Sequence, residues 1–147
     1  MFPVVEPDCS DSGTFDNALE FLLMTGRTLQ EAVMMMIPEA FGPRYHISTD
    51  KRAFYEYHSA IMEPWDGPAA LAMTDGRWVC AGLDRNGLRP ARFWITSDDE
   101  IIYASEAGVL DIDPEKILRK ERLAPGKMIL VDVETGECKV DHQIKGE

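Results

Sequence analysis

Two short polar segments of the sequence have residue types that can contact a ligand. Ser10-Asp11-Ser12-Gly13 precedes an amphipathic stretch, and Asp84-Arg85-Asn86-Gly87 separates two strand-like runs. A carboxylate such as Asp11 can hold an ammonium group through charge-assisted hydrogen bonds, but the same segment is typical of a helix N-cap. From residue types alone, we expect Asp11 to cap a helix.

The second segment has two interpretations as well. It is either a substrate or channel loop, or a turn in which Asn86-Gly87 supply positive φ, and the residues favour the turn. Arg85, Arg89 and Arg92 concentrate positive charge in an acidic chain, where they would receive a carboxylate or, as we expect, pair with acids of the domain.

Motifs for other kinds of chemistry are missing from the sequence. The histidines and cysteines are widely separated: His46, His58, His142, Cys9, Cys80 and Cys138. They form no HExxH or CxxC pattern, and the glycines match neither a P-loop nor a dinucleotide-binding fingerprint. We therefore predict no catalytic residue, no metal site and no nucleotide site, and we expect all three cysteines to be free thiols.

Helices are predicted in the first part of the chain. An apolar stripe at helical spacing ends at Gly26 and comprises Phe15, Leu19, Leu22 and Leu23. Thr28 and Glu31 form a capping box for a second helix, which Pro38 ends. Met34-Met35-Met36 lies on this helix, and we expect it to fill core rather than form a binding surface.

A third helix and a later helix start are also predicted. The third is expected to run from a cap at Asp50 to Met62, with Phe54, His58 and Ile61 on one face. Proline and acidic residues at 113–116 are typical of a helical first turn.

Six strands in three antiparallel hairpins are predicted after the turn cluster at 63–68. The hairpins are 69–74 with 77–83, 92–96 with 100–105, and 127–133 with 137–140. Asp75-Gly76 predicts a type I′ turn in the first. The fold class is therefore α+β, with helices first and antiparallel hairpins after them.

Composition limits the class of protein. The 147 residues carry a net charge of −11, which argues against nucleic acid as a partner. No apolar run approaches the length of a membrane-spanning helix, and residues 1–11 do not read as a secretion signal. We expect a cytoplasmic protein with no membrane partner.

Five segments together resemble the glutamate synthase large-subunit family. They are SDSGTFDN at 10–17, MEPWDGPAALAMTDGR at 62–77, GLDRNGLRPAR at 82–92, YASEAGVLD at 103–111 and LAPGKMILVD at 123–132. They occur in the family's order and cover nearly the whole chain. A more distant resemblance is to the glutaminase half of amidophosphoribosyltransferase, which is the alternative enzyme.

The resemblance implies part of an Ntn-hydrolase αββα sandwich, the class II glutamine amidotransferase (glutaminase) domain. In this family an N-terminal cysteine attacks the amide of glutamine, its α-amino group acts as base, and an Asn and a Gly N–H form the oxyanion hole. The ammonia released is used in the reductive amination of 2-oxoglutarate to glutamate. The Asp of the Ser-Asp-Ser element holds the α-amino group of glutamine, so the resemblance assigns Asp11 to substrate binding.

The resemblance also indicates what lies outside these residues. In the family the nucleophile, the arginine for the glutamine carboxylate and the oxyanion Asn-Gly precede the Ser-Asp-Ser element, whereas only residues 1–9 precede it here. Cys9 leads directly into the helix cap, so we do not expect it to be the nucleophile. We expect residues 1–147 to be the C-terminal portion of the glutaminase domain, inactive alone and partnered by the remainder of the synthase.

No cofactor is expected to bind this chain, because the family's flavin mononucleotide (FMN) and iron–sulfur cluster belong to the synthase region. Electrons reach that region from NAD(P)H or ferredoxin. A non-catalytic interaction module that retains the fold is the alternative from a different class of protein.

Overall fold

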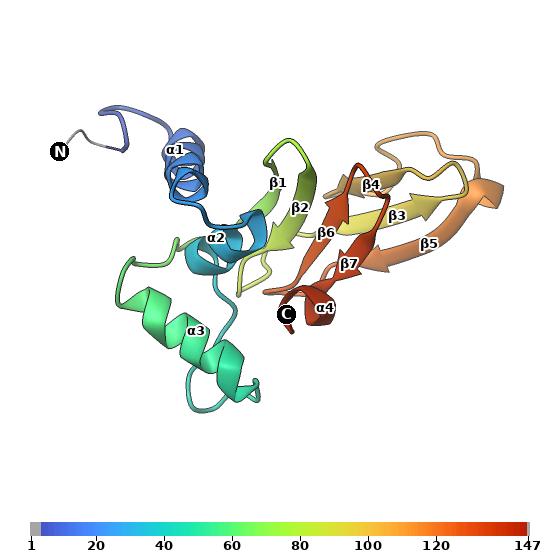
Figure 1. Cartoon of the computed structure of the whole chain (residues 1–147). Coiled ribbons are helices and arrows are strands. Elements are labelled where there is room, and N and C mark those ends of the chain that lie inside the picture. The colour runs from blue at the N-terminus through green and yellow to red at the C-terminus, as the bar shows by residue number, and fades with distance from the viewer. Residues whose placement is uncertain (1–3, 147) are drawn as a thin grey trace.

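The computed structural model describes residues 4–146, and its α+β architecture matches the prediction (Figure 1). Helices α1 (Asp11–Met24), α2 (Leu29–Met36) and α3 (Thr49–Ser59) come first. The strands are β1 (Ala70–Thr74), β2 (Trp78–Leu83), β3 (Arg92–Thr96), β4 (Ile101–Ala104), β5 (Ile117–Arg122), β6 (Met128–Asp132) and β7 (Cys138–Val140). A 3₁₀ helix, η1 (Pro114–Lys116), precedes β5, and α4 (Asp141–Ile144) follows β7.

Side-chain caps fix where the helices begin. The hydroxyl of Ser10 accepts from the backbone N–H of Gly13 at 3.2 Å, so Ser10 is the N-cap of α1 and Asp11 is its first residue. The capping box predicted for α2 is confirmed, because the backbone N–H of Thr28 donates to the Glu31 carboxylate at 2.8 Å and the Glu31 N–H donates to the Thr28 hydroxyl.

The prediction for the third helix is wrong at both ends. Ser48, not Asp50, is the cap of α3, since its hydroxyl accepts from the Lys51 N–H at 3.3 Å. Asp50 lies in the first turn, where a carboxylate suits the positive end of the helix dipole. The helix ends at Ser59, so Ile61 lies beyond it and is exposed.

Two antiparallel sheets form the second part of the chain. One has the strand order β1-β2-β6-β7 and the other has the order β4-β3-β5. Along β2, Cys80 faces the helices and pairs with Leu130 of β6, while Ala81 faces the second sheet and pairs with Ile129. This alternation lets one sheet serve two cores.

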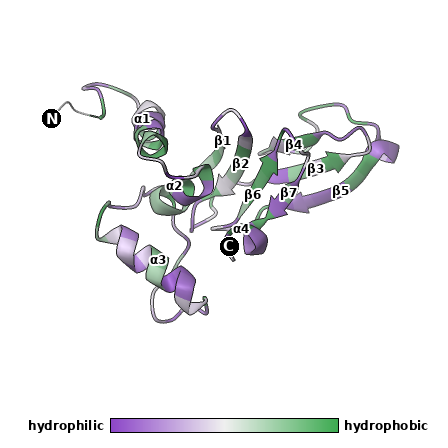
Figure 2. Ribbon diagram, viewed as in Figure 1, coloured by the Kyte–Doolittle hydropathy of each residue, from purple (hydrophilic) through white to green (hydrophobic). Residues whose placement is uncertain are grey.

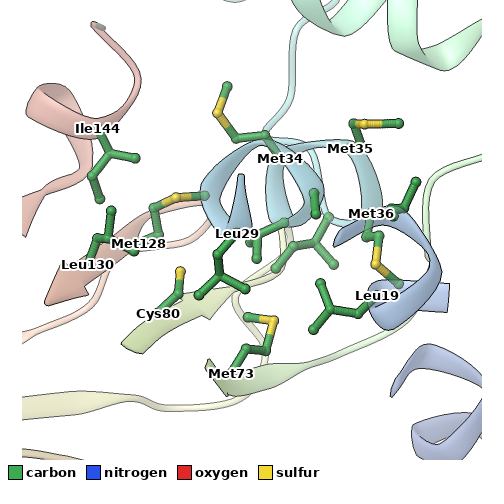
Figure 3. Close-up of a cluster of buried hydrophobic side chains, with 14 of the residues drawn as sticks. Leu19, Leu29, Met34, Met35, Met36, Met73, Cys80, Met128, Leu130 and Ile144 are labelled. Atoms are coloured by element: carbon green, nitrogen blue, oxygen red, sulfur yellow. The ribbon is translucent and has the colours of Figure 1, made fainter. Parts of the chain in front are cut away.

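The larger core lies between the helices and the four-stranded sheet. Figure 3 shows side chains of α1, α2, the sheet and α4 meeting there: Leu19, Leu29, Met34, Met35, Met36, Met73, Cys80, Met128, Leu130 and Ile144. Leu29 and Met36 are fully buried. The prediction that the three consecutive methionines fill core is therefore confirmed.

A smaller core lies between the two sheets. It is formed by Ala81, Leu83, Ala91, Phe93, Leu123 and Ile129. The hydroxyl of Tyr103 on β4 donates to the carbonyl oxygen of Gly82 on β2 at 3.3 Å, which ties the sheets together. The described residues thus form three layers, helices on a sheet on a sheet, and Figure 1 shows these layers in order.

Two further predictions about the strands need correction. The helix start predicted at 113–116 is present only as the 3₁₀ helix η1, and the chain then enters β5, a strand that was not predicted and that pairs with β3. Figure 2 shows that most of β6 is hydrophobic, whereas most of β5 is hydrophilic, as suits the exposed edge of a sheet. Gly76 has a φ of +97°, but Asp75 is not in the positive-φ region, so the turn is not type I′.

Asp75 makes the first hairpin turn in another way. Its carboxylate accepts from the N–H groups of Arg77 at 3.0 Å and Trp78 at 2.7 Å. The side chain therefore stabilises the turn through its own hydrogen bonds, as Asp does at many turns.

An ionic cluster joins α4 to the rest of the chain. The buried carboxylate of Glu39 is 2.7 Å from the ammonium of Lys51 and 3.1 Å from that of Lys127. Asp141 is 3.0 Å from Lys127 and 2.7 Å from Lys145, whose side chain is only 1% exposed. Burial lowers the pKa of Lys145, and the two acids oppose that effect.

Within the described residues, no helix is both long and apolar enough to cross a membrane.

Candidate functional site

A cleft of about 760 Å³ lies where α1, β1 and two loops meet. It is lined by Ser10, Asp11, Ser12, Phe15, Trp65, Asp66, Gly67, Pro68, Ala69, Ala70, Leu71, Arg89, Pro90 and Ser105. Asp11, the residue that the sequence singled out, is thus part of its wall. A cleft of this size accommodates a small metabolite.

Asp11 does not cap the helix, contrary to the expectation from residue types alone. Ser10 supplies the oxygen that caps the helix, so the carboxylate of Asp11 makes no capping hydrogen bond. Asp11 is exposed, and within residues 4–146 its carboxylate has no hydrogen-bond or ion-pair partner. An unpaired carboxylate at the edge of a cleft is suited to hold a cationic group.

The helix that carries Asp11 is held against the opposite wall by an aromatic contact. The ring of Phe15, one turn further along α1, meets that of Trp65 edge to face, with centroids 5.3 Å apart and planes at 82°. The backbone N–H of Trp65 donates to the carbonyl oxygen of Met36 at 2.6 Å, at the end of α2. Both sides of the cleft are therefore tied to the helical core.

The loop at 84–89 holds the wall segment, which we define as residues 66–69. The guanidinium of Arg89 donates to the carbonyl oxygen of Pro68 at 3.2 Å, and Arg85 lies 3.6 Å from the carboxylate of Asp66. These contacts confirm that Arg85 pairs with an acid. The contact of Arg89 is with a carbonyl oxygen and not with an acid, and no described interaction tests the expectation for Arg92.

The turn at 84–87 is present, although its backbone differs from the prediction. Gly87 has a φ of +59°, whereas Asn86 is not in the positive-φ region. A Cβ atom on Gly87 would lie 2.3 Å from the Pro125 side chain, so the close approach of that proline also requires glycine.

The segments identified in the sequence converge at this cleft. Asp11 comes from the first segment, Trp65 from the second, Arg89 from the third and Ser105 from the fourth. The fifth segment contacts the third, because the backbone N–H of Gly126 donates to the carbonyl oxygen of Asp84 at 2.9 Å. The sequence identified these segments, but it did not assign site roles to Trp65, Arg89 or Ser105.

The cysteines differ in their capacity for nucleophilic chemistry. Burial raises the pKa of the Cys80 thiol to about 12, and burial also raises that of Cys138. Neither is therefore poised to form a thiolate near neutral pH. Cys9 is exposed and is not among the residues that line the cleft. All three are free thiols, as expected.

Metal-binding chemistry is not favoured by the residues that the structure describes. Among residues 4–146, no group of three His, Cys, Asp or Glu side chains could hold a metal ion. Cys80 lies in the helical core, while Cys138 is on β7 and Cys9 precedes α1. These residues do not offer the thiolate set that an iron–sulfur cluster requires.

Comparison with known proteins agrees with the resemblance seen in the sequence. The family model for class-II glutamine amidotransferases matches residues 1–147. The chain is 52% identical over 145 residues to the glutamate synthase [NADPH] large chain of Bacillus subtilis, covering 99% of this chain and 10% of the relative. It is 50% identical to the glutamate synthase [NADH] of Schizosaccharomyces pombe, covering 99% of this chain and 7% of the relative.

A solved structure shares the fold. The glutamine phosphoribosylpyrophosphate amidotransferase of B. subtilis superposes with a TM-score of 0.51 at 18% sequence identity, over 92% of this chain and 23% of that chain. The chain spans about a tenth or less of the length of the two synthase relatives. On the match over all of its residues, the chain belongs to the class-II glutamine amidotransferases.

Proposed function

We propose that this chain is the glutamine-binding part of the glutaminase domain of a glutamate synthase. The observation that carries the proposal is the unpaired carboxylate of Asp11 at the wall of the 760 Å³ cleft. Asp11 would hold the α-ammonium group of glutamine and so fix the orientation of the substrate. The similarity to two glutamate synthases supports this choice of enzyme.

The charges around the cleft suit an amino-acid ligand. Asp11 and Asp66 supply negative charge, and Arg89 supplies positive charge on the opposite loop. A zwitterion such as glutamine presents one group of each sign, so both can be matched within one cleft. The rings of Phe15 and Trp65 would shield the bound substrate from water on one side.

The reactive thiol in this proposal comes from polypeptide other than residues 4–146. The raised pKa values of Cys80 and Cys138 support this, as does the position of Cys9 away from the cleft wall. The family chemistry then releases ammonia, which the parent enzyme adds to 2-oxoglutarate. FMN and an iron–sulfur cluster would serve that later reaction outside this chain, and the parent enzyme would be cytoplasmic.

The identities favour a synthase over the alternative amidotransferase. The chain shares 52% of its residues with a glutamate synthase but 18% with the phosphoribosylpyrophosphate amidotransferase, a likeness that extends to the fold alone. A non-catalytic module that retains the fold would release no ammonia from glutamine, even when the missing half of the domain is supplied.

Calorimetric titration with glutamine tests the assignment of Asp11. The Asp11→Asn variant should bind about tenfold or more weakly, since a hydrogen bond to a charged group contributes about 1.5–3 kcal/mol. Asp16→Asn is the matched control, because Asp16 is an exposed acid on the same helix and does not line the cleft. Equal affinities for wild type and Asp11→Asn would refute the assignment.

Activity tests the wider proposal. The chain is mixed with the amino-terminal segment of a glutamate synthase relative that carries the catalytic cysteine, and glutamine-dependent ammonia release is measured. We expect release from the mixture and none from either polypeptide alone. Glutamine binding without release from any mixture would favour the non-catalytic module.

A further inference from the structure

Asp84 makes contacts that connect the turn at 84–87 to the cleft, although Asp84 itself does not line the cleft. It is 4% exposed and lies directly after β2. One carboxylate oxygen accepts from the backbone N–H of Ala69 at 3.2 Å, and the other accepts from that of Asn86 at 2.9 Å. Both oxygens of a buried carboxylate are thus occupied by backbone donors.

The backbone of Asp84 strengthens the same connection. Its N–H donates to the carbonyl oxygen of Ala69 at 3.1 Å, so the two residues are joined by a side-chain and a main-chain hydrogen bond. Its carbonyl oxygen accepts from Gly126, and the ammonium of buried Lys145 donates to the carbonyl oxygen of Gly126 at 2.7 Å. Asp84 therefore links the wall segment to the buried ionic cluster.

We propose that Asp84 is a positioning residue that holds residues 66–69 in the shape that receives glutamine. This inference rests on the proposed function, because it assumes that glutamine occupies the cleft. Ala69 lines the cleft and is fixed by Asp84 at both its N–H and its carbonyl oxygen. A wall fixed before binding costs less ordering entropy when the ligand arrives.

An amide at position 84 cannot replace the carboxylate. Asparagine has nearly the same shape but offers one accepting oxygen and one donating nitrogen. Whichever way its amide is turned, the N–H of Ala69 or of Asn86 would face a donor in a buried place. Either the wall or the turn is then loosened, and one backbone donor is left unsatisfied.

Asp132 provides a matched control for this substitution. It is also a buried carboxylate, at 2% exposed, and it accepts from the backbone N–H groups of Glu134 at 2.9 Å and Thr135 at 3.3 Å. It lies in the β6–β7 hairpin and does not line the cleft. Asp132→Asn therefore also replaces a buried carboxylate that accepts backbone N–H groups, in a turn that has no contact with the wall segment, and it additionally removes the ion pair of the second carboxylate oxygen with Arg77 at 2.8 Å.

The test measures glutamine affinity and melting temperature for wild type, Asp84→Asn, Asp132→Asn and Asp11→Asn. Both buried variants should melt at lower temperature, but only Asp84→Asn should weaken glutamine binding, by about tenfold. Wild-type affinity in a folded Asp84→Asn protein, alongside weakened binding in Asp11→Asn, overturns the positioning role alone. No binding by wild type, or wild-type affinity in Asp11→Asn, refutes the proposed function and this inference with it.

A second measurement decides the matter if Asp84→Asn does not fold. Amide hydrogen exchange is followed in the wild-type protein with and without saturating glutamine. Exchange at Ala69 should slow when glutamine binds, while exchange at Glu134 in the control turn should not change. Equal exchange at Ala69 in the two states would overturn the proposal.

Discussion

Replacing Glu39 with glutamine should destabilise the protein more than replacing Lys145 with methionine. Glu39 is 2.7 Å from Lys51, 3.1 Å from Lys127 and 3.6 Å from Lys145. The Glu39→Gln variant leaves three ammonium groups with only the carboxylate of Asp141 to balance them. Lys145→Met leaves two ammonium groups and two carboxylates, so the charges in the cluster still match.

The expected magnitudes follow from what each change leaves behind. Loss of the Glu39 charge leaves buried Lys145 and partly exposed Lys51 and Lys127 short of one counter-charge. Removing one partner of a buried ion pair costs about 3–5 kcal/mol. Loss of Lys145 removes its contacts with Asp141 and Gly126, both at 2.7 Å, but Lys127 still pairs with Asp141. Methionine also preserves the apolar stem, so we expect at most about 2 kcal/mol.

Urea unfolding of the two variants and the wild type measures both free energies. The corresponding fall in melting temperature is about 2–4 °C for each kcal/mol in a domain of this size. A larger loss of stability in Lys145→Met than in Glu39→Gln would refute the reasoning, because it would mean that the hydrogen bond to Gly126 outweighs the balance of charge.

Three more predictions follow from local contacts. Hydrogen bonds from Arg77 are the main cause that lowers the pKa of Asp132 from 3.8 to about 2. The ionised Asp132 carboxylate therefore stabilises the fold above about pH 4, and this stabilisation is lost as the pH falls towards about 2. The difference in melting temperature between wild type and Asp132→Asn should narrow over that range. A constant gap would contradict this. Thr28→Ala should cost about 1 kcal/mol in urea unfolding by removing the α2 cap, and no loss would show that the cap is dispensable. A thiol reagent near neutral pH should label Cys9 in the native protein and Cys80 only after unfolding, as mass spectrometry would show; native labelling of Cys80 would conflict with its burial.

Features encoded by neighbouring residues were predicted well from the sequence. The capping box at Thr28 and Glu31 depends on a three-residue spacing, and the three predicted hairpins depend on local alternation and turn residues. β5 was missed because its exposed edge residues, Leu118 to Arg122, do not alternate between apolar and polar. Its place is fixed by pairing with β3, which is distant in sequence.

The candidate site was predicted only in part for the same reason. Asp11 was identified through the Ser-Asp-Ser element, but its neighbour Ser10 takes the capping role, which residue types could not decide. Trp65, Arg89 and Ser105 reach the cleft from three different segments, and only the tertiary fold brings them together. The contact of Asp84 with Ala69 likewise depends on the packing of two loops.

The central claim is that the carboxylate of Asp11 faces the α-ammonium group of bound glutamine. It is tested most directly by comparing glutamine with 4-carbamoylbutanoate, which is glutamine without its amino group, in wild type and Asp11→Asn. Wild type should bind glutamine about tenfold or more tightly than 4-carbamoylbutanoate. The variant should lose most of that preference, because without the Asp11 carboxylate neither ligand can make the charge-assisted contact. The same preference in both proteins would contradict the account, because the ammonium group would then be held by some other residue.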